Sequence, residues 1–302
     1  MKKRILFFEQ VVLSIVFIII INIMRNMPHS NDIGRLLEDA VSRETKEKDL
    51  AVAFSGGLDS GLIAAMARKH AANISLYTAG TLRPKDGTAD PGWSYDARMA
   101  KSMASELDLE WNHITIDEEG LEKTIEEMMR ITGTTDLLTL SFELPLFYVC
   151  ANCKEDNVMT GQGADEIFAG YSKYVGLEAE SLRKMMKDDL HKLKETTLIH
   201  EKKVAEHFGK KIVYPFLDEE VMALAESMSI YELMPTETTA RKAVLRSVAT
   251  DMGYHSIASK EKKAAQYGSG VMDAIRRLSK NKGLTCNELI ASIAERTEVE
   301  GK

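Results

Sequence analysis

Cysteine is scarce in this sequence, which excludes a fold built on disulfide bonds. Three cysteines among 302 residues do not make a disulfide framework, and their odd number fits a reducing compartment. Positive charge is also short, because 39 Lys and Arg stand against 46 Asp and Glu and the formal net charge is -7. This balance argues against a protein that mainly grips nucleic acid through its phosphates. The 44% of hydrophobic residues is ample for the core of one large domain or two smaller ones, which excludes a disordered chain.

A long apolar run stands at the N-terminus, where three basic residues at 2–4 precede residues 5–24. A helix of about 20 residues spans a bilayer, so this run is long enough for a membrane anchor. No small-x-small cleavage site follows, which disfavours a signal peptide. An anchor and a translated segment upstream of a true start at Met24 or Met27 both stay open. In either case we expect the remainder of the chain to be cytoplasmic.

The stretch around which the chain is organised is residues 50–60, L-A-V-A-F-S-G-G-L-D-S. Residues 50–54 form an apolar run of strand length, and the glycines that follow predict a tight turn. After Ser60 the apolar residues recur at helical spacing, so the turn leads directly into a helix. A helix N-terminus presents unpaired N–H groups and about half a positive charge, which suits a phosphate group.

The residues of this loop favour phosphate and metal binding. Gly56 and Gly57 have no side chain to block close approach of the backbone. Ser55 and Ser60 can donate hydroxyl hydrogen bonds. A carboxylate beside a polyphosphate is repelled unless a cation lies between them, so we interpret Asp59 as a magnesium ligand. The alternative is an ordinary strand-turn-helix joint in which Asp59 or Ser60 caps the helix.

The same loop lacks the Lys that follows the second Gly in a Walker A loop, and it lacks the G-x-G-x-x-G pattern of a dinucleotide turn. It resembles instead the PP-loop of the ATP pyrophosphatases, the enzymes that cleave ATP between its α and β phosphates. That motif is short but specific when, as here, it follows an apolar strand.

The order of the predicted elements indicates an α/β fold with a doubly wound parallel sheet, which binds ligands at the carboxyl ends of its strands. Beyond Tyr171 the composition favours helices, and no further convincing strand is predicted. We therefore expect a PP-loop ATP-binding core at 28–175 and a helical C-terminal part at 176–302. Strands are expected at 50–54, 74–79, 111–116 and 157–160, and helices at 31–47, 95–107, 137–153 and 241–250.

A second stretch with reactive side chains is 161–171, G-Q-G-A-D-E-I-F-A-G-Y, directly after a predicted strand. If that strand is parallel to the one at 50–54, the two loops lie at one edge of the sheet and their carboxylates can share a metal. Asp165 is therefore expected to be the second magnesium ligand, with Glu166 as its neighbour. The alternative is a solvated Asp-Glu turn.

Three lysines lie in residues 259–270, S-K-E-K-K-A-A-Q-Y-G-S-G. Cleavage of ATP between its α and β phosphates builds negative charge on the bridging oxygen, and cationic side chains stabilise that charge. The alternative is a surface loop that carries solvated charges.

Together these stretches resemble the synthetase domain of asparagine synthases. Any one match would be weak, but five in the family's order form a specific pattern over roughly residues 31–273. The matching pieces are S-G-G-L-D-S at 55–60, G-Q-G-A-D-E-I-F-A-G-Y at 161–171, P-F-L-D at 215–218, K-x-x-L-R at 242–246 and K-x-x-A-x-Y-G-S-G at 262–270.

The resemblance implies an ATP-dependent amide ligase of asparagine biosynthesis. Aspartate or a similar acid attacks the α-phosphorus of ATP, pyrophosphate leaves, and ammonia or an amine then displaces AMP. Carried over by position, Asp59 and Asp165 would hold Mg2+, and Lys262 would stabilise the adenylation transition state. The ATP-binding positions that it implies are Ser55, Gly56, Gly57, Leu58, Ser60, Gly161 and Gly163.

The chain departs from the family pattern in three ways. The family's glutaminase domain is missing, so nitrogen would come as free ammonia, from an amine or from a separate glutaminase. Gln162 stands where the family commonly has Glu, and an amide cannot act as a base. If that Glu handles the ammonia proton, the last step needs another base or a different nucleophile. Val213 replaces the Arg usually found two residues before P-F-L-D. These substitutions make the identity of the acid that accepts AMP less certain to follow the family than the use of ATP.

Two other functions stay open: a PP-loop enzyme of another class, such as a tRNA-modifying or cyclising synthetase, and a non-catalytic ATP-binding relative. Cys150 and Cys153 form a C-x-x-C, which suggests sulfur transfer or half a metal site. Both fall inside a predicted apolar helix, and we interpret them as structural. The intact set of Asp59, Asp165 and Lys262 weighs against a pure binder, which has no need of it.

Overall fold

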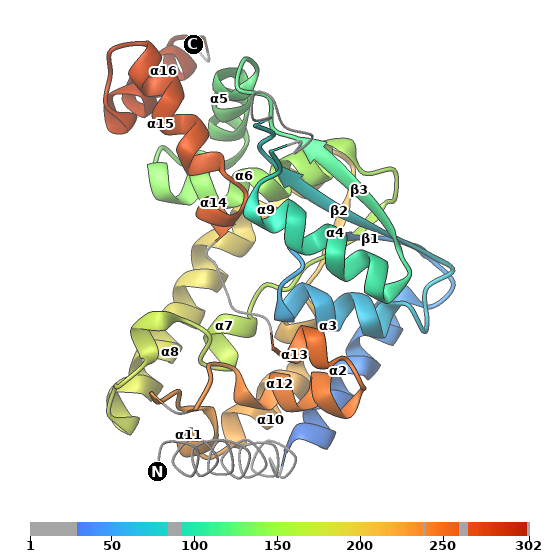
Figure 1. Ribbon diagram of the computed structural model, residues 1–302. Helices are drawn as coiled ribbons and strands as arrows, with labels where there is room; N and C mark the ends of the chain where they lie inside the picture. The colour runs from blue at the N-terminus through green and yellow to red at the C-terminus, as the bar shows by residue number, and fades with distance from the viewer. Residues whose placement is uncertain (1–28, 84–91, 238, 260–264, 301–302) are drawn as a thin grey trace, which may run out of the picture.

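The computed structural model describes residues 29–83, 92–237, 239–259 and 265–300. At its centre lies a five-stranded parallel sheet in the order β3-β2-β1-β4-β5 (Figure 1). The chain builds outward from β1 to β3 and then returns to the other side of β1 with β4, so the sheet order reverses between β1 and β4. Such sheets bind ligands outside the carboxyl ends of the strands at this reversal. The strands are β1 (Asp49–Ala53), β2 (Asn73–Gly80), β3 (Glu110–Thr115), β4 (Asn157–Met159) and β5 (Lys211–Val213).

Helices cover the sheet and continue below it in Figure 1. They are α2 (Ser30–Thr45), α3 (Leu58–Ala67), α4 (Tyr95–Leu107), α5 (Leu121–Thr132), α6 (Leu137–Asn152), α7 (Ala164–Ile167), α8 (Ala179–Lys192), α9 (Leu198–His207), α10 (Glu219–Ser227), α11 (Ile230–Leu233), α12 (Ala243–Asp251), α13 (His255–Ala258), α14 (Ala265–Gly268), α15 (Val271–Asn281) and α16 (Cys286–Glu300).

Successive residues of β1 point to two hydrophobic cores, because side chains alternate between the faces of a sheet. Leu50 and Val52 pack in the core that includes α2, α3 and α4. Ala51 packs in the core that includes α5, α6 and α9. The later helices contribute to both, since α8, α10 and α12 join the first core and α15 and α16 join the second.

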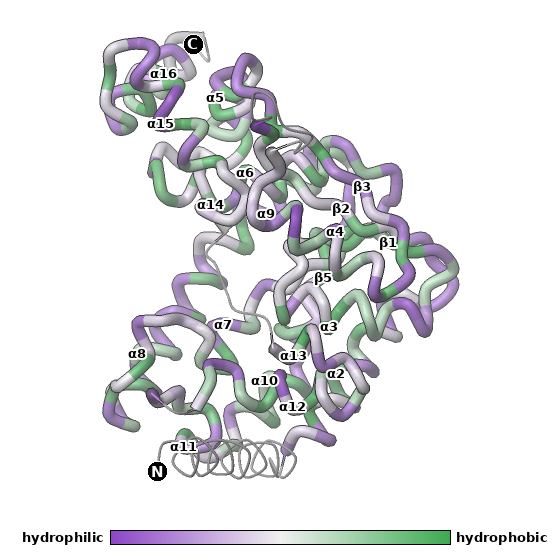
Figure 2. The backbone as a smooth tube through the Cα atoms, in the orientation of Figure 1, coloured by the Kyte–Doolittle hydropathy of each residue, from purple (hydrophilic) through white to green (hydrophobic). Residues whose placement is uncertain are grey.

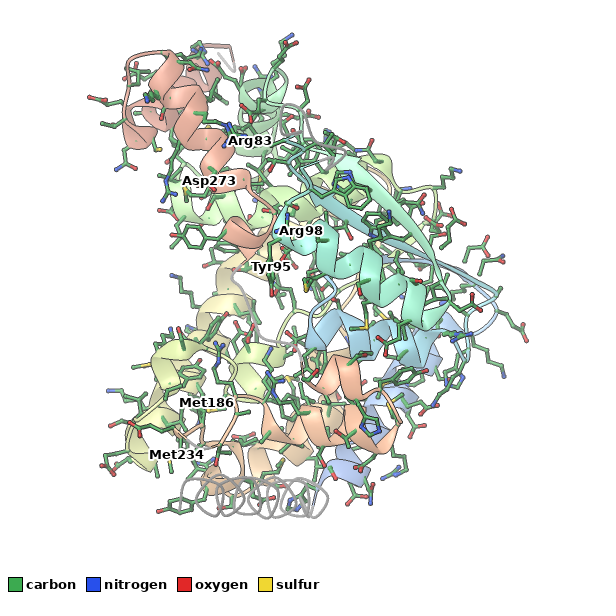
Figure 3. The ribbon with its side chains drawn as sticks, in the orientation of Figure 1. Arg83, Tyr95, Arg98, Met186, Met234 and Asp273 are labelled. Atoms are coloured by element: carbon green, nitrogen blue, oxygen red, sulfur yellow. The ribbon has the colours of Figure 1, made fainter. Side chains whose placement is uncertain are left out.

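Several helices bury one side only. In α5, α8 and α15 the chain changes between hydrophilic and hydrophobic within a few residues (Figure 2), as amphipathic helices do. Away from the sheet, Met186 of α8 and Met234, which follows α11, lie together in the C-terminal helical part (Figure 3). The helical part therefore adds its own apolar contacts to the first core.

The predicted α/β class with a parallel sheet is confirmed, and the four predicted strands agree with β1 to β4 to within one residue at each end. The prediction that no strand follows Tyr171 is wrong, because β5 pairs in parallel with β4. β5 has three residues, of which Val213 alone is buried, so it is too short to show an alternating pattern. The boundary between the two predicted parts, 28–175 and 176–302, stays a prediction.

Two predicted helices begin elsewhere. The helix expected at 241–250 is α12, which starts at Ala243 and leaves Lys242 just outside it with a φ of 58°. The helix expected at 31–47 is α2, which starts at Ser30 after an N-cap residue, His29, whose side chain makes no capping hydrogen bond.

Within the described parts of the chain, none of the helices is long and apolar enough to cross a bilayer. The predicted anchor at 5–24 lies outside the described residues. The anchor and the cytoplasmic location therefore stay predictions.

Candidate active site

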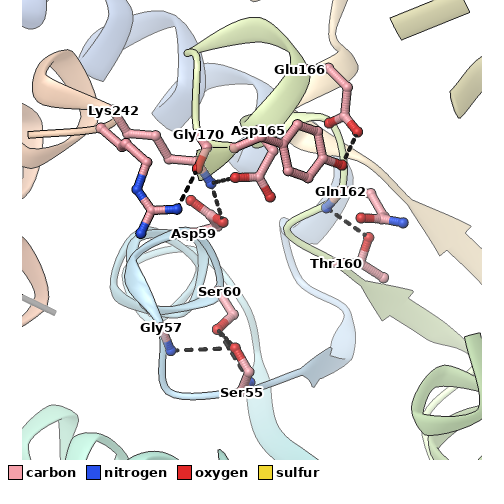
Figure 4. A network of polar contacts seen from close by, with 12 residues as sticks. Ser55, Gly57, Asp59, Ser60, Thr160, Gln162, Asp165, Glu166, Gly170 and Lys242 are labelled. Carbon is pink, nitrogen blue, oxygen red and sulfur yellow. Dashed lines mark hydrogen bonds and ion pairs between the residues drawn. The ribbon is translucent and has the colours of Figure 1, made fainter. Parts of the chain in front are cut away.

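The loop after β1 closes through two serine hydroxyls at the start of α3 (Figure 4). The Ser55 N–H donates to Ser60 Oγ over 3.3 Å, and the two hydroxyl oxygens are also 3.3 Å apart. The Gly57 N–H donates to Ser55 Oγ over 3.4 Å. Gly57 is the N-cap of α3, and no side chain caps this helix. The alternative in which Asp59 or Ser60 serves as an ordinary helix cap is therefore wrong.

The glycines of this loop differ in what surrounds them. Gly56 has a φ of 70°, and a Cβ on it would lie 2.4 Å from the backbone nitrogen of Ala100, so its missing side chain lets α4 pack against the loop. A Cβ on Gly57 would meet, among the described residues, only Ser55 Oγ at 3.3 Å. Leu58 buries its side chain in the core, so it offers only backbone to a ligand.

Gly161 brings the second loop into contact with the first. It follows β4, the parallel neighbour of β1. A Cβ on Gly161 would lie 2.9 Å from the Cβ of Asp59, which is closer than a side chain allows. Gly163 lies two residues after Gly161 and is the N-cap of α7. The prediction that the two loops meet at one edge of the sheet is confirmed.

Asp59 and Asp165 converge on one cation, the side-chain ammonium group of Lys242 (Figure 4). Its Nζ lies 2.5 Å from Asp59 Oδ2 and 2.7 Å from Asp165 Oδ1. Lys242 is 4% exposed. Burial lowers the pKa of Lys242, and the neighbouring Asp59 carboxylate acts in the opposite direction. The two predicted metal ligands are thus held together by a third residue that the sequence analysis did not assign to the site.

The donor set at this position fits Mg2+, which prefers carboxylate oxygens and completes its shell with water and phosphate. Asp59 Oδ1 is buried and accepts no hydrogen bond from the described residues. A cluster of three or more His, Cys, Asp or Glu suited to a metal does not occur in the described ranges. A magnesium ion held here would take two carboxylates from the chain and its other ligands from phosphate or water.

Two neighbours of Asp165 in the sequence point to other partners. Glu166 is buried, accepts a 2.5 Å hydrogen bond from the Tyr171 hydroxyl, and has its pKa raised by burial. Gln162 Nε2 donates to Glu201 Oε1 over 2.8 Å. Glu201 lies on α9 and is another residue that the sequence analysis missed. Nothing in that Lys- and Glu-rich segment distinguishes a buried glutamate from the exposed ones.

Lys262 lies outside the described residues, so its role stays a prediction. The end of its motif is described. The Thr81 N–H, directly after β2, donates to the Ser269 carbonyl oxygen over 2.9 Å. Tyr95 and Arg98, at the start of α4, lie beside this segment (Figure 3). The motif therefore reaches the same edge of the sheet as the two loops.

The C-x-x-C supports the structural interpretation of its cysteines. Cys150 and Cys153 are both buried and neither forms a disulfide. Burial raises the pKa of Cys150 to about 12, which disfavours a reactive thiolate at neutral pH.

The parallel sheet, the loop after β1 and the paired carboxylates at the strand ends define an α/β protein of the PP-loop type. The asparagine synthase family model matches residues 32–180 and 174–283, so the chain belongs to the asparagine synthase family.

Over the residues that align, relatives with curated names are about a quarter identical to this chain. A glutamine-hydrolysing asparagine synthetase of Methanocaldococcus jannaschii is 28% identical over 291 residues, which are 84% of this chain and 52% of that protein. Asparagine synthetase B of Escherichia coli is 25% identical over 271 residues, 82% of this chain and 46% of the relative. The chain spans about half the length of these relatives.

Among solved structures, NMN synthetase from Francisella tularensis aligns with a TM-score of 0.42 and 16% identity over 91% of this chain and 94% of that one. This degree of likeness is too low to say anything about function.

Proposed function

We propose that this protein is an ATP-dependent amide ligase that adenylates a small carboxylic acid, aspartate or one like it, and releases pyrophosphate. Ammonia or an amine then displaces AMP and forms the amide. Membership of the asparagine synthase family supports ATP-dependent amidation as the general reaction. The acid, the nitrogen donor and the order of the steps belong to the proposal.

The observation that carries the proposal is the convergence of Asp59 and Asp165 beside the uncapped start of α3. The backbone of residues 55–60 binds the phosphates of ATP, and the two aspartates hold Mg2+. The metal, when bound, neutralises charge on the phosphates. Lys242 holds two like charges in one place, and Lys262 adds positive charge where negative charge builds up on the leaving pyrophosphate.

Nitrogen reaches the acyl adenylate as ammonia or an amine. A separate glutaminase as its source follows from the family resemblance alone. A PP-loop enzyme of another class and a non-catalytic ATP-binding relative are the alternatives, and one experiment tests the proposed ligase against both.

That experiment is the exchange of labelled pyrophosphate into ATP, with magnesium and a panel of amino acids that begins with aspartate. We expect exchange that depends on one acid, and amide formation once ammonium is added. Asp59→Asn should lower the exchange by about 100-fold or more, because it removes charge that balances the metal at the reacting phosphates. Asp108→Asn is the control, since this residue at the end of α4 is 91% exposed and lies outside the site.

Two outcomes would contradict the proposal. ATP binding without exchange for any acid would favour a cyclising, tRNA-directed or non-catalytic protein. Acid-dependent exchange that Asp59→Asn leaves unchanged would show that the metal assignment is wrong.

A further inference from the structure

A group of buried and partly buried polar side chains beside the site has no part in the reaction proposed above. We call it the Glu201 cluster, and it consists of Glu143 on α6, Gln162 after β4, His200 and Glu201 on α9, and Tyr214 after β5. Glu201 is 4% exposed. A carboxylate this buried costs free energy unless its oxygens are satisfied, so its presence calls for an explanation.

One oxygen of Glu201 has a firm partner and the other does not. Oε1 accepts the 2.8 Å hydrogen bond from Gln162 Nε2. Oε2 is buried and has no hydrogen bond of good geometry from the described residues. The Tyr214 hydroxyl is near enough to lower the pKa of Glu201 but makes no such bond to Oε2. A lone pair on Oε2 is therefore available to a proton.

Among the groups of the cluster, Glu201 is the one that titrates near neutral pH. Burial raises its pKa to about 7, and the Glu166 carboxylate adds to the rise while hydrogen bonds oppose it. Burial raises the pKa of Glu143 to about 9 and lowers that of His200, so both are neutral at pH 7. A general base works best when its pKa is close to the working pH. The titratable groups that interact with Glu201 are Glu143, Cys150, Glu166 and Tyr214, and His200 lies 3.2 Å from Glu143 Oε1.

Amide formation releases one proton, and the strand-end loops offer few groups to receive it. The two aspartates share the ammonium group of Lys242, and Glu166 is held by a tyrosine hydroxyl. Gln162 is an amide and takes up no proton. Its side chain instead connects the second loop to Glu201.

We infer that Glu201, held against Gln162, is the base that takes the proton from nitrogen in the amide-forming step. This inference rests on the proposed function. In the step, the nitrogen lone pair attacks the acyl carbon and forms the C–N bond. The bond from that carbon to the AMP oxygen breaks, and its electron pair leaves on the phosphate of AMP. One N–H proton passes to Glu201 Oε2 and then to water before the next turnover.

The test compares the two half-reactions in the full chain. Glu201→Gln should leave acid-dependent pyrophosphate exchange within about twofold of wild type, because adenylation needs no nitrogen base. It should lower amide formation with ammonia by about 100-fold or more. Glu206→Gln, at an exposed position of the same helix, is the matched control and should change neither rate.

The pH dependence distinguishes a base from a structural residue. At a constant concentration of un-ionised ammonia, amide formation by the wild type should rise with pH through an inflection at about 7 and then level off, because Glu201 must be ionised to accept a proton. Glu201→Gln should lose this inflection. Pyrophosphate exchange should not show it in either protein.

A second variant keeps the test decisive if Glu201→Gln does not fold. Gln162→Glu combined with Glu201→Gln exchanges the two side chains, so that one carboxylate and one amide stay in contact. The double variant should recover most of the amide formation, because the carboxylate then stands on the loop itself.

Three results would overturn the inference. Unchanged amide formation and an unchanged pH profile in Glu201→Gln would reject it while the proposed ligase stands. Loss of pyrophosphate exchange together with amide formation would reject it too, because Glu201 would then be structural. No acid-dependent exchange in the wild type would remove the proposed function and this inference with it.

Discussion

Lys242 is the residue just before α12, and its backbone has a φ of 58°. Its ammonium group reaches Asp59 and Asp165, which come from two different loops. A buried ion pair adds little stability compared with apolar side chains, but removing one partner leaves an uncompensated buried charge. We therefore expect the main effect of removing Lys242 to come from the two carboxylates that it would leave without a cation.

Lys242→Met keeps the length of the side chain and removes its charge. We expect it to lower the free energy of unfolding by about 3 kcal/mol, because the two carboxylates then lie together without a cation. Added Mg2+ should recover much of this loss in the variant and stabilise the wild type less. Denaturant unfolding with and without Mg2+ measures both effects.

The control for this prediction is Lys69→Met, which removes a half-exposed ion pair with Glu38. It should cost less than about 1 kcal/mol. A Lys242→Met protein that is as stable as the wild type without Mg2+ would show that the ion pair does not hold the carboxylates in place.

The meeting of Asp59 and Asp165 was predictable from sequence, because two parallel strands deliver their loops to one edge of a sheet. Lys242 and Glu201 were not. Lys242 has a positive φ and Glu201 lies among charged residues in the sequence, so neither belongs to a periodic pattern. Each reaches the site through a contact with a residue that is distant in sequence. The K-x-x-L-R match was the one signal that pointed towards Lys242.

Among elements, the periodic ones were predictable. Helix α4 has the predicted bounds, and the apolar run of β1 was displaced by a single residue. β5 was missed because its place depends on pairing with β4 and on a 2.7 Å hydrogen bond from the Lys211 N–H to the Asp156 carbonyl oxygen. Such a strand is decided by its neighbours and not by its own residues.

Gly56→Ala tests how closely α4 packs against the loop after β1. The new Cβ would lie 2.4 Å from the backbone nitrogen of Ala100, at a φ of 70°. Both the clash and the φ involve backbone, so we expect a loss of about 3 kcal/mol in the free energy of unfolding. Thermal or urea unfolding measures it.

Gly133→Ala is the matched control, because Gly133 has a φ of 79° but no described atom lies within 4 Å of the added Cβ. It should lower the free energy of unfolding by about 1 kcal/mol, because only the strain of an alanine at positive φ remains. Equal losses in the two variants would show that the contact with α4 adds nothing.

At the scale of the whole molecule, the candidate site draws on both parts of the chain. The core supplies the two loops, and the later residues supply Lys242 and Glu201. Contacts such as the 2.5 Å ion pair between Arg43 and Asp218 join α2 to the residue that caps α10. We therefore expect the two parts of the chain, on either side of residue 175, to unfold together in one transition.

Two buried glutamates should make the stability of the whole protein depend on pH. Burial raises the pKa of Glu143 to about 9 and that of Glu201 to about 7, against 4.5 for the unfolded chain. Between the unfolded and folded values the folded state keeps a proton that the unfolded state has lost. Stability from these groups is thus fully present below pH 4.5 and is lost as pH rises through the folded pKa.

Glu143→Gln should flatten this dependence, since an amide stays neutral at every pH. Each such group lowers the free energy of unfolding by up to about 1.4 kcal/mol per pH unit inside its window. The variant should therefore gain stability over the wild type as pH rises from 4.5 towards 9. Urea unfolding at several pH values measures the difference between the two proteins. Glu127→Gln, a half-exposed site, should run parallel to the wild type. If Glu143→Gln ran parallel as well, Glu143 would be ionised in the folded protein.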